Sequence, residues 1–103
     1  MANQEIDDFK SKVIFILSHL PAGEVISYGE LAKQAGYPRH ARQVGSLLKK
    51  LPKDTKLAWH RVVNSKHHIS FTEGTEAYLR QRHALEMEGW VITGQRLLTK
   101  EAP

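Results

Sequence analysis

Residues 27–52, SYGELAKQAGYPRHARQVGSLLKKLP, contain two short helical patterns separated by a glycine. Ser27 and Glu30 have the S-x-x-E spacing of a capping box, in which each side chain satisfies a free backbone amide of the other residue at a helix start. Apolar positions follow as far as Gly36, a residue type that commonly ends helices. The first pattern therefore predicts a helix from Ser27 to Gly36.

The second pattern begins after Pro38, which has the fixed backbone angle that suits the first turn of a helix. Its apolar positions form one stripe that ends before Pro52: Ala41, Val44, Leu48 and Leu51. Its polar and basic positions, spaced three, four and seven apart, form the opposite surface: Arg39, Arg42, Gln43, Ser46, Lys49 and Lys50. Two short helices, joined by a three-residue turn that contains glycine, predict a helix-turn-helix whose second helix has a basic outer face.

The flanking sequence predicts further elements around this pair of helices. Residues 4–20 have helical spacing and stop at Pro21 and Gly23, which predicts an amphipathic helix. Residues 57–71 predict a short β ribbon or wing, with Asn64 and Ser65 as its turn signal. Residues 75–88 predict a last helix capped by Gly89, and residues 90–98 a terminal hairpin.

Together these elements predict a fold class that is mainly α with a small β ribbon, in a winged helix-turn-helix arrangement. The 103 residues are enough for one domain with a modest core and too few for two. No repeat or linker interrupts the sequence, so we expect a single domain over residues 1–103.

Positive charge is concentrated in the middle of the chain. Residues 33–66 contain nine Lys and Arg and one Asp, a net charge of +8, although the net charge of the whole chain is only +4. A polyanion is the natural partner of such a field, and nucleic acid suits it better than a membrane surface, because no basic helix with a wide apolar face accompanies it. A solvated basic face without a partner is the alternative.

Composition excludes several kinds of chemistry. The chain has no cysteine, which rules out disulfides, thiolate metal sites and a cysteine nucleophile. The histidines that suggest a metal site do not have the spacing of a zinc motif: His60, His67, His68 and His83. No phosphate-binding or dinucleotide-binding glycine pattern is present, so we expect neither metal nor cofactor.

The sequence also bears on location. The longest apolar run, Val13–Leu17, is far too short for a membrane span, and the acidic start of the chain differs from a secretory signal. We therefore expect an intracellular, cytoplasmic protein.

Three segments together resemble the DNA-binding domain of O6-alkylguanine-DNA alkyltransferases: residues 26–32 (ISYGELA), 41–45 (ARQVG) and 59–65 (WHRVVNS). The resemblance covers residues 9–89, nearly the whole chain. In those enzymes the third segment begins Pro-Cys-His-Arg-Val, and the cysteine takes the alkyl group from guanine. Here Ala58 and Trp59 replace the proline and the cysteine. Tryptophan at this position is the hallmark of the alkyltransferase-like proteins, which resemble the enzymes but transfer nothing.

The resemblance implies a function for the chain. It implies a non-enzymatic sensor that binds O6-alkylguanine in double-stranded DNA through the minor groove, turns the damaged nucleotide out of the helix and flags it for nucleotide excision repair proteins. It further implies a monomer that associates with the nucleoid when bound to DNA.

The resemblance also assigns residues to roles. It implies nucleotide flipping by Tyr28 and Arg42, and a structural network that includes Asn64 and Glu88. It implies a lesion pocket formed by Trp59, His60, Arg61, Ser70 and Thr72. The basic and small polar residues of the helix-turn-helix would contact the DNA backbone: Arg39, Ser46, Lys49 and Lys50.

The chemistry of these side chains leaves alternatives open. Trp59 can stack on an extruded base but is no substitute for a thiolate, and it could equally be a core residue. Arg42 could contact a phosphate, and Tyr28 could simply pack on the core. Two other classes of function remain: a winged-helix transcription regulator without lesion specificity, and a base-removing enzyme that uses His60 and Glu88.

Overall fold

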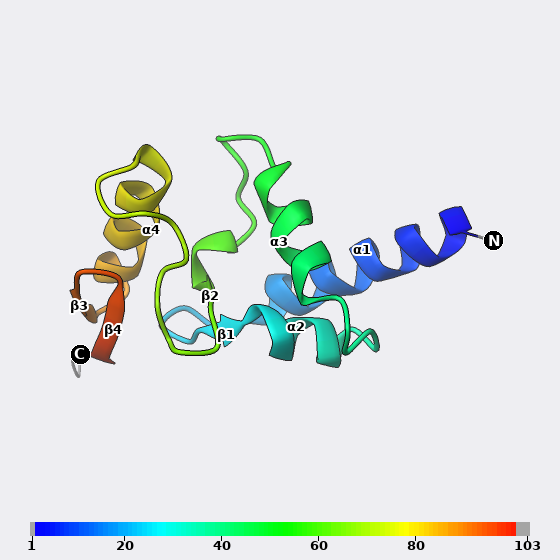
Figure 1. Cartoon of the computed structure of the whole chain (residues 1–103), viewed down its shortest axis with the longest axis horizontal. Helices are drawn as coiled ribbons and strands as arrows, with labels where there is room; N and C mark the ends of the chain where they lie inside the picture. The colour runs from blue at the N-terminus through cyan, green and yellow to red at the C-terminus, as the bar shows by residue number, and fades with distance from the viewer. Residues whose placement is uncertain (1, 101–103) are drawn as a thin grey trace. The chain divides into compact units, whose positions relative to one another are not determined.

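The computed structural model describes residues 2–100, and side chains from residue 8 to residue 99 (Figure 1). Its helices are α1 (Ala2–His19), α2 (Tyr28–Gln34), α3 (Ala41–Lys49) and α4 (Glu76–Met87), with a 3-10 turn at Trp59–Arg61. Its strands are β1 (Ile26–Ser27), β2 (Val62–Val63), β3 (Trp90–Thr93) and β4 (Arg96–Lys100). The predicted class, mainly α with little β structure, is confirmed. Residues 1 and 101–103 of the predicted domain lie outside the described residues.

The chain forms two compact units. The first unit contains the chain up to Leu20 together with Tyr28–Trp59, and the second contains Pro21–Ser27 together with the chain from His60 onward. None of the helices in the described part of the chain is long and apolar enough to cross a membrane.

The first unit packs α1 against α2 and α2 against α3. Phe9, Val13 and Leu17 recur every four residues, so they form one buried stripe along α1. Leu31 of α2 and Val44 of α3 are completely buried, and they complete a small apolar core for the helix-turn-helix. The apolar spacing that predicted these helices therefore corresponds to the faces that are buried.

The connection between α2 and α3 differs from the prediction. It spans residues 35–40 rather than three residues, and α3 begins at Ala41 rather than beside Pro38. Gly36 has φ +88°, and the N–H groups of Gly36 and Tyr37 donate to the carbonyls of Lys33 and Ala32, which is a Schellman cap.

Pro38 then occupies the second position of a turn, because the N–H of His40 donates to the carbonyl of Tyr37 at 2.9 Å. The proline therefore belongs to the turn that follows α2 and not to the first turn of α3. Its fixed φ suits both positions, so the residue type alone did not distinguish them.

The second unit has a core cluster formed by side chains from α4, both hairpin strands and the segment after Trp59: Val63, Ile69, Tyr78, Leu85, Ile92 and Leu97. The predicted last helix and terminal hairpin are confirmed. Thr75 caps the start of α4, Gly89 follows its end with φ +98°, and β3 pairs antiparallel with β4 through a turn at Gly94.

The predicted ribbon within residues 57–71 was wrong in its pairing. The chain does turn at Asn64, whose N–H donates to the carbonyl of His68 at 3.0 Å. However, β2 pairs in parallel with β1, Ile26 opposite Val62, and the segment after the turn pairs with the hairpin instead. The N–H of Ile69 donates to the carbonyl of Gln95 at 2.7 Å, which places Ile69 in the core.

Capping of α4 gives a direct test of this fold. The hydroxyl of Thr75 accepts a hydrogen bond from the N–H of Tyr78 at 3.3 Å. Thr75→Ala leaves that N–H without its cap, and we expect the free energy of unfolding to fall by about 1 kcal/mol in urea denaturation. Thr75→Ser keeps the hydroxyl and is the control. Equal losses in the two variants would contradict the capping role.

Candidate nucleic-acid interface

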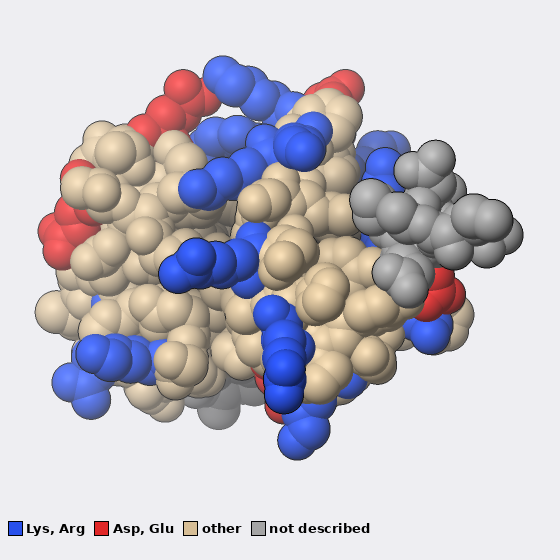
Figure 2. Space-filling model, turned by 45° about the vertical axis from the view of Figure 1, so that its right-hand side comes forward, with Lys and Arg blue, Asp and Glu red and all other residues tan. Residues whose placement is uncertain are grey.

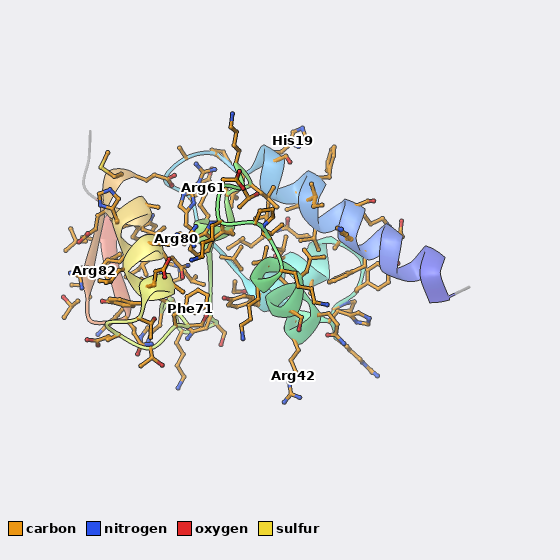
Figure 3. All side chains as sticks on the ribbon, turned by 90° about the horizontal axis from the view of Figure 1, so that it is seen from above. His19, Arg42, Arg61, Phe71, Arg80 and Arg82 are labelled. Carbon is orange, nitrogen blue, oxygen red and sulfur yellow. The ribbon has the colours of Figure 1, made fainter. Side chains whose placement is uncertain are left out.

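Tyr28 and Arg42 lie on the two helices of the helix-turn-helix. Tyr28 is the first residue of α2, and its ring lies against Gly45 of α3, where an added Cβ would lie 3.8 Å from the ring. Arg42 is exposed, and Figure 3 shows its side chain extending away from α3. Gly45 lies three residues, about one helical turn, after Arg42. The ring of Tyr28 therefore packs on α3 about one turn from the Cα atom of Arg42.

The other residues expected to contact the DNA backbone are also exposed. Arg39 lies in the turn before α3, and Ser46, Lys49 and Lys50 lie on α3 or at its end. The sequence of α3, ARQVGSLLK, contains no acidic residue. Extended Lys and Arg side chains project from the surface in Figure 2. The outer face of α3 therefore presents uncompensated positive charge, which attracts a polyanion.

Trp59 is the last residue of the first unit and begins the 3-10 turn. Its side chain is half-buried, unlike the preceding Ala58, which is buried. The backbone N–H of Trp59 donates to the carbonyl of Leu57 at 2.8 Å, so the turn begins with a local bond. Trp59 is therefore partly exposed to solvent, unlike a fully buried core tryptophan.

His60, Arg61 and Glu88 form one network in the second unit. The Glu88 carboxylate is 2.8 Å from His60 Nε2 and accepts hydrogen bonds from Arg61 Nε at 3.0 Å and Arg61 Nη2 at 2.8 Å. The N–H of Gly23 also donates to Glu88, at 2.9 Å. Glu88 is the residue that follows α4, where the helix dipole disfavours an anion, so these donors supply the necessary compensation.

The network lowers the pKa of Glu88. Burial alone would raise it, but the hydrogen bonds from Arg61, His60 and the Gly23 N–H outweigh burial and hold the pKa at about 2, below its ordinary value of 4.5. Glu88 is therefore an anion at neutral pH and is unsuited to act as a general base near pH 7.

Asn64 holds the turn after β2. Its Oδ1 accepts hydrogen bonds from the N–H of Lys66 at 2.9 Å and from the N–H of His68 at 3.0 Å. Ser70 and Thr72, which the resemblance assigned to the lesion pocket, are exposed on the loop between Ile69 and α4.

Sequence reasoning missed Gln81. This residue of α4 is 1% exposed, and its Nε2 donates to the carbonyls of His60 at 3.0 Å and Val62 at 2.9 Å. It therefore fixes the backbone directly after Trp59. The available signal was its position between Tyr78 and Leu85 on the buried face of α4, where a polar residue needs a partner.

The histidines do not assemble into a metal site. Among the residues that the structure describes, there is no group of three or more His, Cys, Asp or Glu side chains that could hold a metal ion.

Acid titration tests the Glu88 network. Between about pH 4.5 and pH 2 the unfolded chain binds a proton at this carboxyl that the folded protein does not bind, so folding stability rises with pH across that window and is lost as pH falls through 2. In Glu88→Gln we expect the slope of unfolding free energy against pH, measured by urea denaturation, to fall by up to about 1.4 kcal/mol per pH unit.

Glu86→Gln is the matched control, because Glu86 is on the same helix and pairs with Arg82 at the surface. An equal change of slope in the two variants would show that the Glu88 network has no special role.

Comparison with known proteins identifies relatives over most of the chain. The family model for the 6-O-methylguanine DNA methyltransferase, DNA binding domain, matches residues 8–90. The DNA base-flipping protein of Escherichia coli K12 is 49% identical over 88 residues, which are 85% of this chain and 67% of that protein. Alkyltransferase-like protein 1 of Schizosaccharomyces pombe is 42% identical over 84 residues, 82% of this chain and 78% of that protein.

Solved structures agree with these matches. Crystalline S. pombe Atl1 in complex with damaged DNA containing O6-carboxymethylguanine has a TM-score of 0.81 and 39% identity, with 90% of each chain covered. The Mycobacterium tuberculosis OGT in complex with DNA has a TM-score of 0.67 and 35% identity, covering 79% of this chain and 48% of that one. Because this chain has no cysteine, it has no thiol with which to accept an alkyl group. The chain belongs to the family of the 6-O-methylguanine-DNA methyltransferase DNA-binding domain, and within it to the alkyltransferase-like proteins.

Proposed function

We propose that this protein is a non-enzymatic sensor of O6-alkylguanine in double-stranded DNA. The observation that carries the proposal is Trp59, a half-buried indole at the position where the resembling enzymes have their acceptor cysteine. Support comes from the relatives named as base-flipping and alkyltransferase-like proteins and from the Atl1 complex with damaged DNA.

Replacement of the cysteine separates binding from reaction. Alkyl transfer requires a thiolate, which is both ionised and strongly nucleophilic. The indole of Trp59 is uncharged and offers one N–H donor and a broad apolar face. It can stack on an extruded base and exclude water, so the damaged base is held and later released unchanged.

Tyr28 and Arg42 turn the nucleotide out of the duplex. A base inside the stack must be extruded at a cost of about a few kcal/mol, and the cost is lower where a lesion weakens pairing. Arg42 extends from α3 and can enter the gap, because its planar guanidinium stacks on neighbouring bases and donates hydrogen bonds to the orphaned partner base. Tyr28, whose ring lies against Gly45, crowds the nucleotide that leaves.

The helix-turn-helix enters the minor groove. Ser46 is a small, exposed residue of α3, which permits close approach to the DNA, and Gly45 beside it leaves room for the ring of Tyr28. Arg39, Ser46, Lys49 and Lys50 anchor the phosphates around it and supply affinity without reading sequence. Specificity then comes from the lesion rather than from a base sequence.

The residues after Trp59 support the pocket. His60 and Arg61 are held by Glu88, and Gln81 holds the carbonyls of His60 and Val62, so this segment is fixed by its neighbours in the second unit. Without a thiol to activate, His60 and Glu88 keep a positioning role. Ser70 and Thr72 supply exposed hydroxyl groups for the lesion pocket, and Asn64 keeps its turn closed.

The bound lesion is not repaired by this protein. A monomer that holds an extruded base and deforms the duplex marks the site for nucleotide excision repair proteins, and the complex resides in the cytoplasm on the nucleoid. The reaction that removes the lesion belongs to those proteins.

Matched duplexes test the proposal. We expect tighter binding, measured by fluorescence anisotropy at one salt concentration, to a duplex with one O6-methylguanine than to the same duplex with guanine. Mass spectrometry should find the masses of DNA and protein unchanged after incubation. Equal affinities would indicate a regulator without lesion specificity, and an altered mass would indicate an enzyme.

Two alanine variants separate flipping from anchoring. Arg42→Ala should reduce the ratio of lesion to guanine affinity on the order of tenfold, because a contact within the base stack is lost. Lys49→Ala should weaken binding to both duplexes by a similar factor. It should also reduce the slope of log affinity against log salt concentration by about one, the amount expected for one lost phosphate contact. The opposite ranking of the two variants would overturn the role of Arg42.

A further inference from the structure

The first unit contains a cavity to which the proposed function assigns no ligand, although two of its lining residues, Ser46 and Lys50, are also proposed phosphate contacts. Its volume is about 560 Å³, a size typical of small-molecule and side-chain binding sites. The residues that line it come from α1, from the turn before α3 and from α3 to just past its end: Phe9, Lys10, Tyr37, His40, Gln43, Ser46, Leu47, Lys50 and Leu51.

Aromatic rings form one wall of this cavity. The ring centroids of Phe9 and Tyr37 are 5.3 Å apart, those of Phe9 and His40 are 5.4 Å apart, and those of Tyr37 and His40 are 5.2 Å apart. Leu47 and Leu51, both half-buried, add aliphatic surface. Three mutually packed rings with two leucines form a surface suited to an apolar side chain.

One polar group in this wall has no partner. His40 Nδ1 is buried, and it makes no hydrogen bond to any group that the structure describes. The backbone of His40 is fully used, since its N–H donates to Tyr37 and its carbonyl accepts from Val44. A buried polar atom without a hydrogen bond costs stability, so a rotation of the His40 ring that brings Nδ1 to the cavity surface would let a ligand supply the bond that the protein alone does not make.

Charge at the cavity favours an anion. Lys10 and Lys50 both line it and are exposed. The nearby acidic group, Asp8, already accepts a hydrogen bond from the Tyr37 hydroxyl at 2.6 Å and pairs with Lys12 at 3.3 Å. Its charge is therefore compensated locally, while Lys10 and Lys50 make no ion pair with the side chains that the structure describes, residues 8–99. A carboxylate in the cavity would share Lys50 with the phosphates of bound DNA.

We propose that this cavity binds an acidic segment of a partner protein. The segment inserts one aromatic or large aliphatic side chain into the cavity, and carboxylates of the segment flank that side chain. The apolar side chain covers the three rings, the carboxylates face Lys10 and Lys50, and a polar atom of the segment reaches His40 Nδ1. Phosphates of DNA match the lysines but leave the apolar wall uncovered, so a peptide fits better. The inference stands beyond lesion recognition and does not depend on it.

A defined peptide tests this inference. The probe is acetyl-Asp-Glu-Trp-Asp-Glu-amide, and its matched control is acetyl-Asn-Gln-Trp-Asn-Gln-amide, with the same ring but no charge. We expect the acidic peptide to shift the amide NMR signals of Phe9, His40 and Leu47 in the whole chain, saturably and at least tenfold more tightly than the neutral peptide.

Variants locate the binding. Leu47→Trp fills the cavity and should abolish peptide binding, and Lys10→Gln, at an exposed position, should weaken it about threefold through loss of one rim charge. Lys33→Gln, an exposed lysine on α2, is the control and should have no effect. None of the three variants should change affinity for duplex DNA.

Two results would overturn the inference. One is the absence of saturable shifts at these residues, or equal binding of the acidic and neutral peptides. The other is saturable binding of a thymidine tetranucleotide that shifts the same signals of Phe9, His40 and Leu47 as strongly as the acidic peptide does, which would make the cavity part of a nucleic-acid site.

Discussion

The Glu88 carboxylate joins three segments that are far apart in the sequence. It receives hydrogen bonds from the loop before β1 at Gly23, from the segment after Trp59 at Arg61, and lies 2.8 Å from His60. Burial of this anion would be unfavourable without these donors, and the partly buried Arg61 would lose its ion pair with Glu88. The geometry of the segment that follows Trp59 therefore depends on one charge-assisted network. Because the chain has no thiol for it to activate, the network fixes this segment and takes no part in a reaction.

Local signals in the sequence were sufficient for most of the fold. Apolar spacing predicted α1, Thr75 and Gly89 bounded α4, and Gly94 marked the terminal hairpin. The errors arose where one residue type serves two purposes or where pairing is non-local. Pro38 suits both a helix start and a turn, and Val62 pairs with Ile26, a residue of another segment, rather than with its neighbour across the Asn64 turn.

The sequence predicted which residues of α3 are exposed, but only part of the contacts around Glu88. Exposure of Arg42 and Lys49 follows from the helical spacing of α3, and the Trp59 position follows from the resemblance to the alkyltransferases. By contrast, Gln81 and the Gly23 N–H enter the site only through tertiary contacts with His60 and Glu88. No spacing rule connects residues so distant in the chain, and a buried glutamine is recognised as a positioning residue only when its acceptors are known.

Contact between Tyr28 and Gly45 has a mechanical consequence. Because a Cβ at position 45 would already be in ordinary contact with the tyrosine ring, at 3.8 Å, a side chain larger than alanine would have to displace that ring and so change the spacing of Tyr28 from Arg42. The two side chains proposed to act on a nucleotide are thus carried by one packed pair of helices. Under the proposed function, a pair that keeps this packing on DNA would leave the deformation to the double helix.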